Sequence, residues 1–287
     1  MDSKIRIGIV GYGNLGRGVE LAVAQNADMQ LAAVFTRRDP GGVRLQMAGV
    51  PVHGMDDIAR HCAAIDVLIL CGGSKDDLPV QGPQLARLCT TVDSFDTHAK
   101  IPEHFDAVDA AAKAGGHVAL ISIGWDPGLF SLQRLMGEAL LPQGATYTFW
   151  GKGLSQGHSD AVRRVPGVQG GVQYTIPSEE AIERVRSGER PQLNTRDKHV
   201  RECFVVLAPG ADADAVRQTI VTMPDYFADY DTTVHFISAE ELARDHGAMP
   251  HGGFVIRSGG TGVAGETHQT VEFSLKLGSN PEFTASV

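Results

Sequence analysis

The chain has 287 residues, about twice the length of a common single domain, and its 43% hydrophobic content is enough for a buried core. Its formal net charge is −9 at pH 7 and no run of lysine or arginine exceeds two residues. We therefore expect no nucleic-acid partner, because such a surface needs clustered cations, and no membrane partner, because no apolar run approaches the roughly 18 residues of a spanning helix.

The first residues run directly into a strand-like segment without the apolar core of a signal peptide, so we expect a cytoplasmic protein. Four cysteines, Cys62, Cys71, Cys89 and Cys203, lie far apart with no CxxC pair. Buried, reduced thiols are the expectation for such cysteines in that compartment. The histidines show no HExxH or other ligand spacing, and no metal site is expected.

Up to about residue 125, short apolar runs alternate with amphipathic stretches, which predicts βαβ units on a parallel sheet. The predicted strands are Ile5–Val10, Leu31–Phe35, Val67–Cys71, Val92–Phe95 and Val118–Ser122. The predicted helices are Asn14–Gln25, Met55–Cys62, Val80–Leu88 and Pro102–Ala114, and a turn is predicted at Asp39–Gly42. Pro102 stands in the first turn, where proline is tolerated.

Beyond Gly128 the predicted strands are longer and irregular Gly/Pro stretches separate them: Tyr147–Trp150, Cys203–Leu207, Val234–Ser238 and Val271–Leu277. Two polar helices are predicted, Ser178–Ser187 and Ala211–Thr222. The alternation in Val271–Leu277 is typical of an antiparallel strand buried on one side.

We thus expect an α/β fold of two domains. Residues 1–125 form a Rossmann-type domain with a doubly wound parallel sheet. Residues 126–287 form an α+β domain with a mostly antiparallel sheet. No helix is expected after the last strand, and the last residues are free to return to the first domain.

The GxGxxG motif Gly11-Tyr12-Gly13-Asn14-Leu15-Gly16 follows an apolar strand at once and opens an amphipathic helix. Gly11 permits the tight turn, Gly13 lets the backbone approach a pyrophosphate, and Gly16 permits close helix–strand packing. The helix N-terminus offers free N–H groups to the anion. This context predicts a dinucleotide site; the alternative is a glycine-rich turn without a ligand.

The end of the second strand distinguishes the two nicotinamide cofactors. An NAD site places Asp or Glu there for the ribose 2′-hydroxyl, whereas this chain has Thr36-Arg37-Arg38. A hydroxyl and two guanidiniums suit a 2′-phosphate. We therefore predict NADP; the alternative is two solvated arginines on a surface turn.

Small or acidic residues follow three further strands of the predicted sheet, at the edge where α/β proteins bind ligands. Gly72-Gly73-Ser74 would let a cofactor cross the strand end. Asp96 and Asp126 each stand just past a strand, and either could hold an ammonium or accept its proton. The alternative is a pair of turn or N-cap aspartates, with Asp126-Pro127 opening a helix.

The segment Gly153-Leu154-Ser155-Gln156-Gly157 matches GxSxG, the nucleophile elbow of α/β hydrolases, so a serine hydrolase is a competing hypothesis. That elbow needs a strand running directly into a helix. Lys152 and Gly153 break the strand, and Pro166 disfavours a long helix, so we expect a glycine-rich binding loop. A non-catalytic NADP-sensing module is a third hypothesis.

The sequence as a whole resembles the meso-diaminopimelate D-dehydrogenase family. The most specific strings are GWDPG at Gly124–Gly128 and FWGKGLSQGHSDA at Phe149–Ala161. Further matches cover the whole chain: VGYGNLGRGVE at Val10–Glu20, FTRR at Phe35–Arg38, VDSFDTHAKIP at Val92–Pro102, TMPDYF at Thr222–Phe227, MPHGG at Met249–Gly253 and LKLGSNPEFTAS at Leu275–Ser286.

The resemblance implies NADP-dependent oxidative deamination of the D-centre of meso-2,6-diaminopimelate, giving L-2-amino-6-oxopimelate and ammonia. It also implies a homodimer or larger homo-oligomer, with residues 126–287 as the domain for substrate binding and dimerisation. It implies cofactor contacts at Gly11, Tyr12, Gly13, Asn14, Leu15, Gly16, Thr36, Arg37, Arg38, Cys71, Gly72, Gly73, Ser74, Ser94, Phe95, Asp96, Ile123, Gly124, Trp125, Asp126 and Pro127. It implies substrate contacts at Asp96, Asp126, Trp150, Gln156, Gly157, Thr175, Arg201, His251 and Asn280.

The chemistry of the substrate accounts for that set. Arg201 suits a carboxylate, Trp150 suits the carbon chain, and Asp96 or Asp126 suits the reacting amine as a catalytic proton acceptor. Taken alone, Arg201 could instead be a surface residue and Trp150 a core residue. Members of the family usually continue some tens of residues beyond TAS with a helical segment, whereas this sequence ends at Val287.

Overall fold

A computed structural model describes residues 4–287, which divide into two units. The first unit holds the residues up to Ser131 together with Pro281–Val287, and the second holds Leu132–Asn280. Residues 1–3 of the expected first domain lie outside the described residues.

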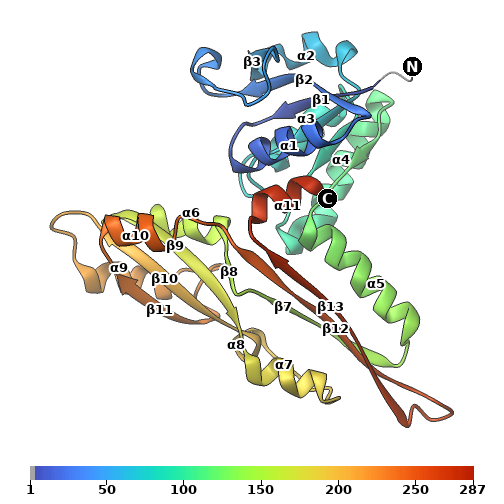
Figure 1. The fold of residues 1–287 in the computed structure, drawn as a ribbon, viewed down its shortest axis with the longest axis vertical. Coiled ribbons are helices and arrows are strands. Elements are labelled where there is room, and N and C mark those ends of the chain that lie inside the picture. The colour runs from blue at the N-terminus through green and yellow to red at the C-terminus, as the bar shows by residue number, and fades with distance from the viewer. Residues whose placement is uncertain (1–3) are drawn as a thin grey trace. The chain divides into compact units, whose positions relative to one another are not determined.

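The first unit is built on a parallel sheet of six strands in the order β3-β2-β1-β4-β5-β6. Strands β1, β2 and β3 of this sheet are labelled in Figure 1. The strands are β1 Ile5–Val10, β2 Met29–Thr36, β3 Val52–Gly54, β4 Val67–Leu70, β5 Thr91–Asp93 and β6 Ala119–Leu120. This order is that of doubly wound dinucleotide-binding folds. The prediction of a Rossmann-type parallel sheet is confirmed, and β3 was not predicted.

Helices cover both faces of this sheet, because alternate side chains of the strands point to opposite sides. On one face, Ile9 of β1 packs with Val19 and Val23 of α1 (Asn14–Gln25). On the other face, Leu68 and Leu70 of β4 pack with residues of α2 and α3. The further helices are α2 Ile58–His61, α3 Leu78–Ala86 and α4 Ile101–Gly115. The helix predicted at Met55–Cys62 is divided into the 3-10 turns η2 (Met55–Asp57) and η3 (Cys62–Ala64) around α2.

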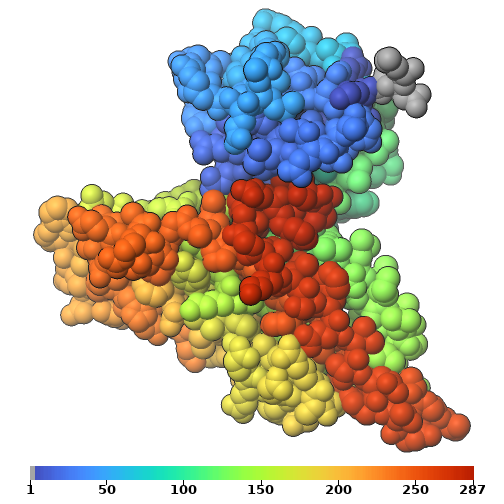
Figure 2. Space-filling view, in the orientation of Figure 1, coloured from blue at the N-terminus to red at the C-terminus, as the bar shows by residue number. Residues whose placement is uncertain are grey.

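The expectation of no helix after the last strand is wrong. Residues Asn280–Ser286 form α11, with Pro281 in its first turn, where proline needs no N–H partner. The red atoms of α11 lie against the blue atoms of α1 in Figure 2. Gly18 permits this approach, since a Cβ there would lie 2.9 Å from the Pro281 carbonyl oxygen. Ala285 packs against the apolar cluster on that face of the sheet.

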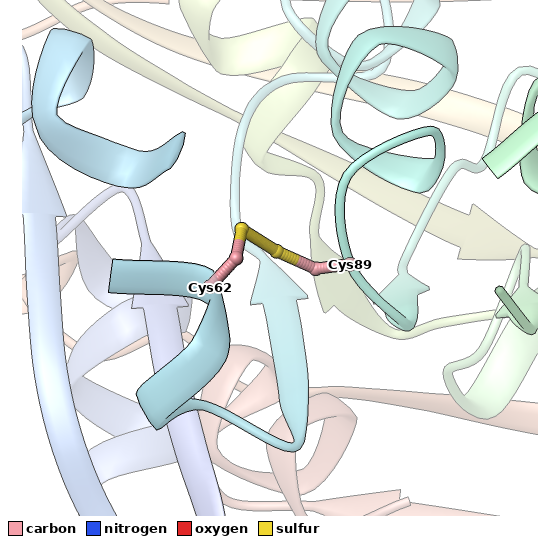
Figure 3. The surroundings of a disulfide bond; sticks show 2 residues. All are labelled: Cys62 and Cys89. Atoms are coloured by element: carbon pink, nitrogen blue, oxygen red, sulfur yellow. A yellow bond between two sulfur atoms is a disulfide. The ribbon is translucent and has the colours of Figure 1, made fainter. Parts of the chain in front are cut away.

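Two of the four cysteines are not reduced thiols, which corrects the expectation for them. Cys62 and Cys89 form a disulfide with Cα atoms 5.9 Å apart (Figure 3). It joins the segment before β4 to the segment after α3, and a sequence separation of 27 residues gave no sign of that proximity. Cys71 and Cys203 are free. Burial raises the pKa of each of these two thiols to about 12.

The second unit contains two sheets rather than one. A four-stranded sheet has the order β11-β10-β9-β8, in which only β10 and β11 are parallel. A three-stranded antiparallel sheet has the order β13-β12-β7, and its β12–β13 hairpin is the longest pairing in the unit (Figure 1). The strands are β7 Gly144–Trp150, β8 Gly153–Leu154, β9 Val168–Pro177, β10 His199–Leu207, β11 Asp231–Phe236, β12 His251–Thr261 and β13 Thr267–Leu277.

Helices bury the apolar faces of both sheets. Val162 of α6 and Ile220 of α9 pack on β10 and β11, and Leu242 of α10 packs on the opposite face. Ile182 and Val185 of α7 cover the three-stranded sheet. The helices are α5 Phe130–Leu140, α6 Gln156–Arg163, α7 Glu179–Arg186, α8 Thr195–Lys198, α9 Ala213–Val221 and α10 Ala239–Asp245. None of the helices in residues 4–287 has the length and apolarity that crossing a membrane requires.

Strands β9 and β12 escaped prediction because glycines interrupt their apolar pattern. Gly252 and Gly253 have φ values of +148° and +156°. A Cβ at Gly252 would lie 2.1 Å from the Leu275 carbonyl oxygen, and one at Gly253 would lie 2.2 Å from that of Phe149. Glycine is therefore required where β12 passes between β13 and β7.

Candidate active site

The GxGxxG loop has the geometry that its sequence predicts. Gly11 follows β1 with φ +91°, and a Cβ at Gly16 would lie 2.2 Å from the Gly11 carbonyl oxygen. Nothing lies within 4 Å of a Cβ at Gly13. Helix α1 begins beside Gly13 without a side-chain cap, so its first N–H groups are available to an anion.

Thr36, Arg37 and Arg38 follow β2 beside this loop. The Thr36 side chain is buried, and its Oγ1 accepts from the backbone N–H of Arg38 at 3.1 Å. Arg38 donates through Nη2 to the Tyr12 carbonyl oxygen. Arg37 is 71% exposed and forms a bidentate pair with Asp77, at 2.7 and 3.1 Å. Both predicted phosphate ligands thus stand beside the glycine loop, each held by a protein acceptor.

These segments line a cavity of about 260 Å³. Its walls are Gly11, Tyr12, Gly13, Thr36, Arg37, Arg38, Met55, Cys71, Gly72, Asp77 and Gln81. Oε1 of Gln81 is buried there without a hydrogen-bond partner, which indicates that a ligand donor completes the wall. The open space at Gly13, the two guanidiniums and the orphaned amide oxygen fit a phosphorylated dinucleotide. Met55, Asp77 and Gln81 carried no sequence signal for this role.

A buried carboxylate holds the glycine loop in place. Glu20 of α1 is fully buried and accepts from the Tyr12 hydroxyl. Its other oxygen accepts from the backbone N–H groups of Gln46 and Met47, at 2.8 and 2.7 Å. Burial and the Glu20 hydrogen bond raise the pKa of Tyr12 to about 12, so the phenol remains a donor. The sequence offered a signal for this role that the sequence analysis did not use: Glu20 lies among the apolar residues on the buried face of α1.

The strand-end aspartates lie on loops of the first unit. Asp96 is exposed after β5, and its backbone N–H donates to Oγ of Ser74 at 3.0 Å. Asp126 is half-buried on the segment Trp125–Leu129 that precedes α5. The alternative in which Asp126 caps a helix is wrong, because the backbone at 126–128 is non-helical and α5 begins at Phe130. The predicted contacts Ser94, Phe95, Ile123, Gly124 and Pro127 lie on the same loops.

In the second unit, strand register brings Arg201 and Thr175 together. Thr175 of β9 pairs with Arg201 of β10 on one side and with Gly153 of β8 on the other. Arg201 is 5% exposed, and Nη1 donates to Oγ1 of Thr175. The Tyr230 ring centre lies 3.9 Å from the guanidinium carbon. Within residues 4–287 Arg201 has no carboxylate partner, and its Nε is unpaired. Burial lowers the pKa of this guanidinium, because desolvation disfavours its charged form.

Trp150 and His251 adjoin this pair. The Trp150 ring stacks on His199 with centres 5.2 Å apart, and the Trp150 backbone N–H donates to Nε2 of His199 at 2.8 Å. Burial, with Arg201 nearby, lowers the pKa of His199 to about 3 and keeps that imidazole neutral. His251 packs directly on Gly153, because a Cβ at Gly153 would lie only 2.4 Å from Cγ of His251. His199 is a further site residue that sequence reasoning missed.

The remaining predicted substrate contacts lie at helix starts. Gln156 and Gly157 open α6, and nothing lies within 4 Å of a Cβ at Gly157. Asn280 opens α11, and its N–H donates to the Met249 carbonyl oxygen at 2.9 Å, two residues before His251. The second unit therefore places Trp150, Gln156, Thr175, Arg201 and His251 on neighbouring elements.

The GxSxG segment is not the expected loop: β8 leads through Ser155 into α6. Oγ of Ser155 lies 2.8 Å from Nδ1 of His158, in the same helix. Ser155 nevertheless has ordinary extended angles, φ −88° and ψ 119°, whereas a nucleophile elbow is strained. No aspartate or glutamate pairs with His158 among the described residues, so the geometry does not form a hydrolase triad. The described residues also contain no cluster of three or more metal-ligating side chains.

Residues 124–279 match the family model described as Diaminopimelic acid dehydrogenase C-terminal domain. A meso-diaminopimelate D-dehydrogenase of Ureibacillus thermosphaericus is 65% identical over 99% of this chain and 86% of its own. The Corynebacterium glutamicum DAP dehydrogenase in complex with DAP has a TM-score of 0.92 at 48% identity, covering 99% of this chain and 86% of that one. An engineered D-amino acid dehydrogenase bound to NADP+ has a TM-score of 0.89 at 46% identity, with the same coverage.

Proposed function

This chain belongs to the diaminopimelate dehydrogenase family, and we infer that it is an NADP-dependent meso-diaminopimelate D-dehydrogenase. It converts the D-centre of meso-2,6-diaminopimelate to a ketone, releasing ammonia and giving L-2-amino-6-oxopimelate. The reverse reaction supplies meso-diaminopimelate for lysine synthesis. The observation that carries the substrate assignment is the buried guanidinium of Arg201, which has no carboxylate partner among the described residues.

The cofactor fits the cavity of the first unit. The N–H groups at the start of α1 would hold the pyrophosphate, and Thr36 with Arg37 and Arg38 would hold the 2′-phosphate. The chemistry supplied by bound NADP⁺ is acceptance of a hydride at the nicotinamide ring. The carboxylate of Asp77 must release Arg37, at least in part, when the 2′-phosphate binds.

The substrate has a carboxylate and an ammonium at each end, and only one α-hydrogen may be presented for removal. Arg201 and Thr175 would bind one carboxylate, with His251 and Asn280 beside them, and Trp150 would lie along the carbon chain. These neutral or cationic groups select a diacid, because a buried guanidinium without an anion is costly. Gln156 and Gly157 at the start of α6 complete this set.

Hydride leaves readily only from a carbon that bears a neutral amine, so a base must first take a proton from the ammonium. We assign this role to one of two carboxylates, Asp126 or Asp96. We expect Asp126→Asn to lower kcat at saturating substrate by about 100-fold or more, because general-base contributions are of that order. A near-normal kcat would exclude Asp126 as the acceptor, and the same substitution at Asp96 would then test the second candidate.

The activity is tested by NADPH absorbance with NADP⁺ and meso-diaminopimelate at alkaline pH. We expect reduction with the meso isomer and none with the L,L isomer, which has no D-centre. Binding of NADP⁺ without turnover would instead favour a sensing module. Labelling of Ser155 by a fluorophosphonate, with loss of turnover, would favour hydrolysis.

We further propose a cytoplasmic homodimer or larger homo-oligomer. Four large apolar side chains of α5 are more than half exposed, Leu132, Leu135, Met136 and Leu140, and a second copy of the chain would cover them. Light scattering of the wild type and of Leu135→Lys tests this assignment: the variant should have the lower mass.

A further inference from the structure

Asp93, the last residue of β5, is a buried carboxylate that connects two loops. It is 3% exposed. Its Oδ1 accepts from the backbone N–H of Phe95 at 3.0 Å and from that of Ser122 at 2.9 Å. Its carbonyl oxygen accepts from the N–H of Ile123 at 2.8 Å. One residue thus fixes the start of the loop that carries Asp96 and the start of the segment that carries Asp126.

His104 of α4 holds this carboxylate from the other side. Its Nε2 lies 2.7 Å from Oδ2 of Asp93, and the imidazole is 5% exposed. The ring also stacks on Phe95 with centres 4.2 Å apart. Gly82 of α3 leaves room for it, because a Cβ there would lie 2.9 Å from Cε1 of His104. The pair is therefore fixed by packing as well as by hydrogen bonds.

The backbone that Asp93 holds is strained. Ser122 has φ +58°, a left-handed conformation that residues other than glycine adopt only at a cost. Its hydroxyl is buried without a hydrogen-bond partner, so the side chain does not stabilise the turn. The Ser122 N–H bond to Asp93 holds this conformation, and the chain then continues to Asp126. A strained backbone conformation of this kind persists only where surrounding contacts hold it in place, and such residues are often found at functional sites.

We propose that Asp93 and His104 are a positioning pair for the dehydrogenation, which hold the Asp96 and Asp126 loops in the arrangement that proton removal requires. The inference rests on the proposed function. Neither residue touches substrate in this assignment: Asp93 acts through the N–H groups of Phe95 and Ser122, and His104 acts through Asp93. A displacement of about 1 Å at a reacting group can cost about 100-fold in rate.

Two substitutions of Asp93 distinguish its role as a hydrogen-bond acceptor from the role of its side-chain volume in packing. Asp93→Leu fills the space but leaves the N–H groups of Phe95 and Ser122 unpaired. Asp93→Asn keeps an oxygen for both, and its amide nitrogen would face Nε2 of His104. We expect kcat to fall about 100-fold in the first variant and less than about tenfold in the second. The KM for meso-diaminopimelate should change less than kcat in both, because Arg201 and Thr175, which would bind a substrate carboxylate, are untouched.

Val108→Ala is the matched control for loss of stability. Val108 is buried one turn beyond His104 on α4, and its truncation leaves a cavity beside Ala86 and Ala112 while the hydrogen bonds of Asp93 are kept. Its melting temperature should fall while kcat stays within about twofold of the wild type. Three results would overturn the proposal: unchanged kcat in Asp93→Leu, equal losses in the two Asp93 variants, or a comparable kcat loss in Val108→Ala.

If Asp93→Leu does not fold, as judged by circular dichroism, His104 provides the same contrast. His104→Gln keeps a donor to Asp93, and His104→Phe keeps the ring stacked on Phe95 but removes the donor. The proposal requires a lower kcat in the phenylalanine variant than in the glutamine variant, and equal values refute it. A wild type that does not oxidise meso-diaminopimelate refutes the proposed function instead, so the two failures are distinguishable.

Discussion

Replacing Arg37 and Arg38 together by alanine should remove the preference for NADP over NAD. Both guanidiniums line the cavity beside the glycine loop. A charge-assisted hydrogen bond to a phosphate contributes about 1.5–3 kcal/mol. Arg37 is 71% exposed and must give up its pair with Asp77, which costs at most about 1 kcal/mol for an exposed pair. The net loss for the double variant is therefore about 3 kcal/mol, or roughly a 100-fold rise in KM for NADP⁺.

The assay is the initial rate of reduction of NADP⁺ and of NAD⁺ at saturating meso-diaminopimelate. The KM for NAD⁺ should change less than about threefold, because NAD⁺ carries no 2′-phosphate. Arg60→Ala is the matched control, since Arg60 is 80% exposed, is paired with Asp57 in the same unit and is not among the residues that line the cavity. A double variant whose ratio of the two KM values equals that of the wild type would refute this account of cofactor selection.

Three further outcomes are expected. Arg201→Met should raise the KM for meso-diaminopimelate by about 10- to 100-fold, because a buried charge-assisted contact is lost; an unchanged KM would place the carboxylate elsewhere. Reducing the Cys62–Cys89 disulfide, which closes a separation of 27 residues, should lower the free energy of unfolding by about 3.5 kcal/mol. Urea midpoints with and without reductant measure this, and the double serine variant should not respond to reductant. The pKa of His199 is about 3 in the folded chain and about 6.5 in the unfolded chain. Between pH 3 and pH 6.5, roughly the range between these two pKa values, the unfolded chain therefore binds one more proton at His199 than the folded chain does. Stability should therefore fall as pH decreases from about 6.5 towards 3, by at most about 1.4 kcal/mol per pH unit for this group. His199→Asn, which retains an acceptor for the Trp150 N–H, should reduce that slope, and an equal slope would contradict the assignment.

The local sequence pattern was sufficient to predict the start of the first unit, because its strand, glycine turn and helix each depend on residues that are close in sequence. An apolar strand, a glycine turn and an amphipathic helix follow one another from Ile5 to Gln25, and the structure has them at the predicted bounds. Thr36-Arg37-Arg38 lies beside the glycine loop because parallel strands of a doubly wound sheet end at one edge. The substrate residues, in contrast, came from the family resemblance and not from spacing.

Tertiary structure decided what depends on partners distant in sequence. Register between β9 and β10 places Thr175 against Arg201, and packing around β4 places Cys62 against Cys89. The pairing of Asp93 with His104 likewise joins a strand end to a helix across the core. The glycines of β12 predict a loop when the sequence is considered alone. In the structure they permit the close approach of the neighbouring strands β7 and β13, and they do not form a local turn. A charged side chain that becomes buried needs a partner, and that partner is brought close by the fold. The residues next to the charged side chain in the sequence therefore do not predict which partner it has.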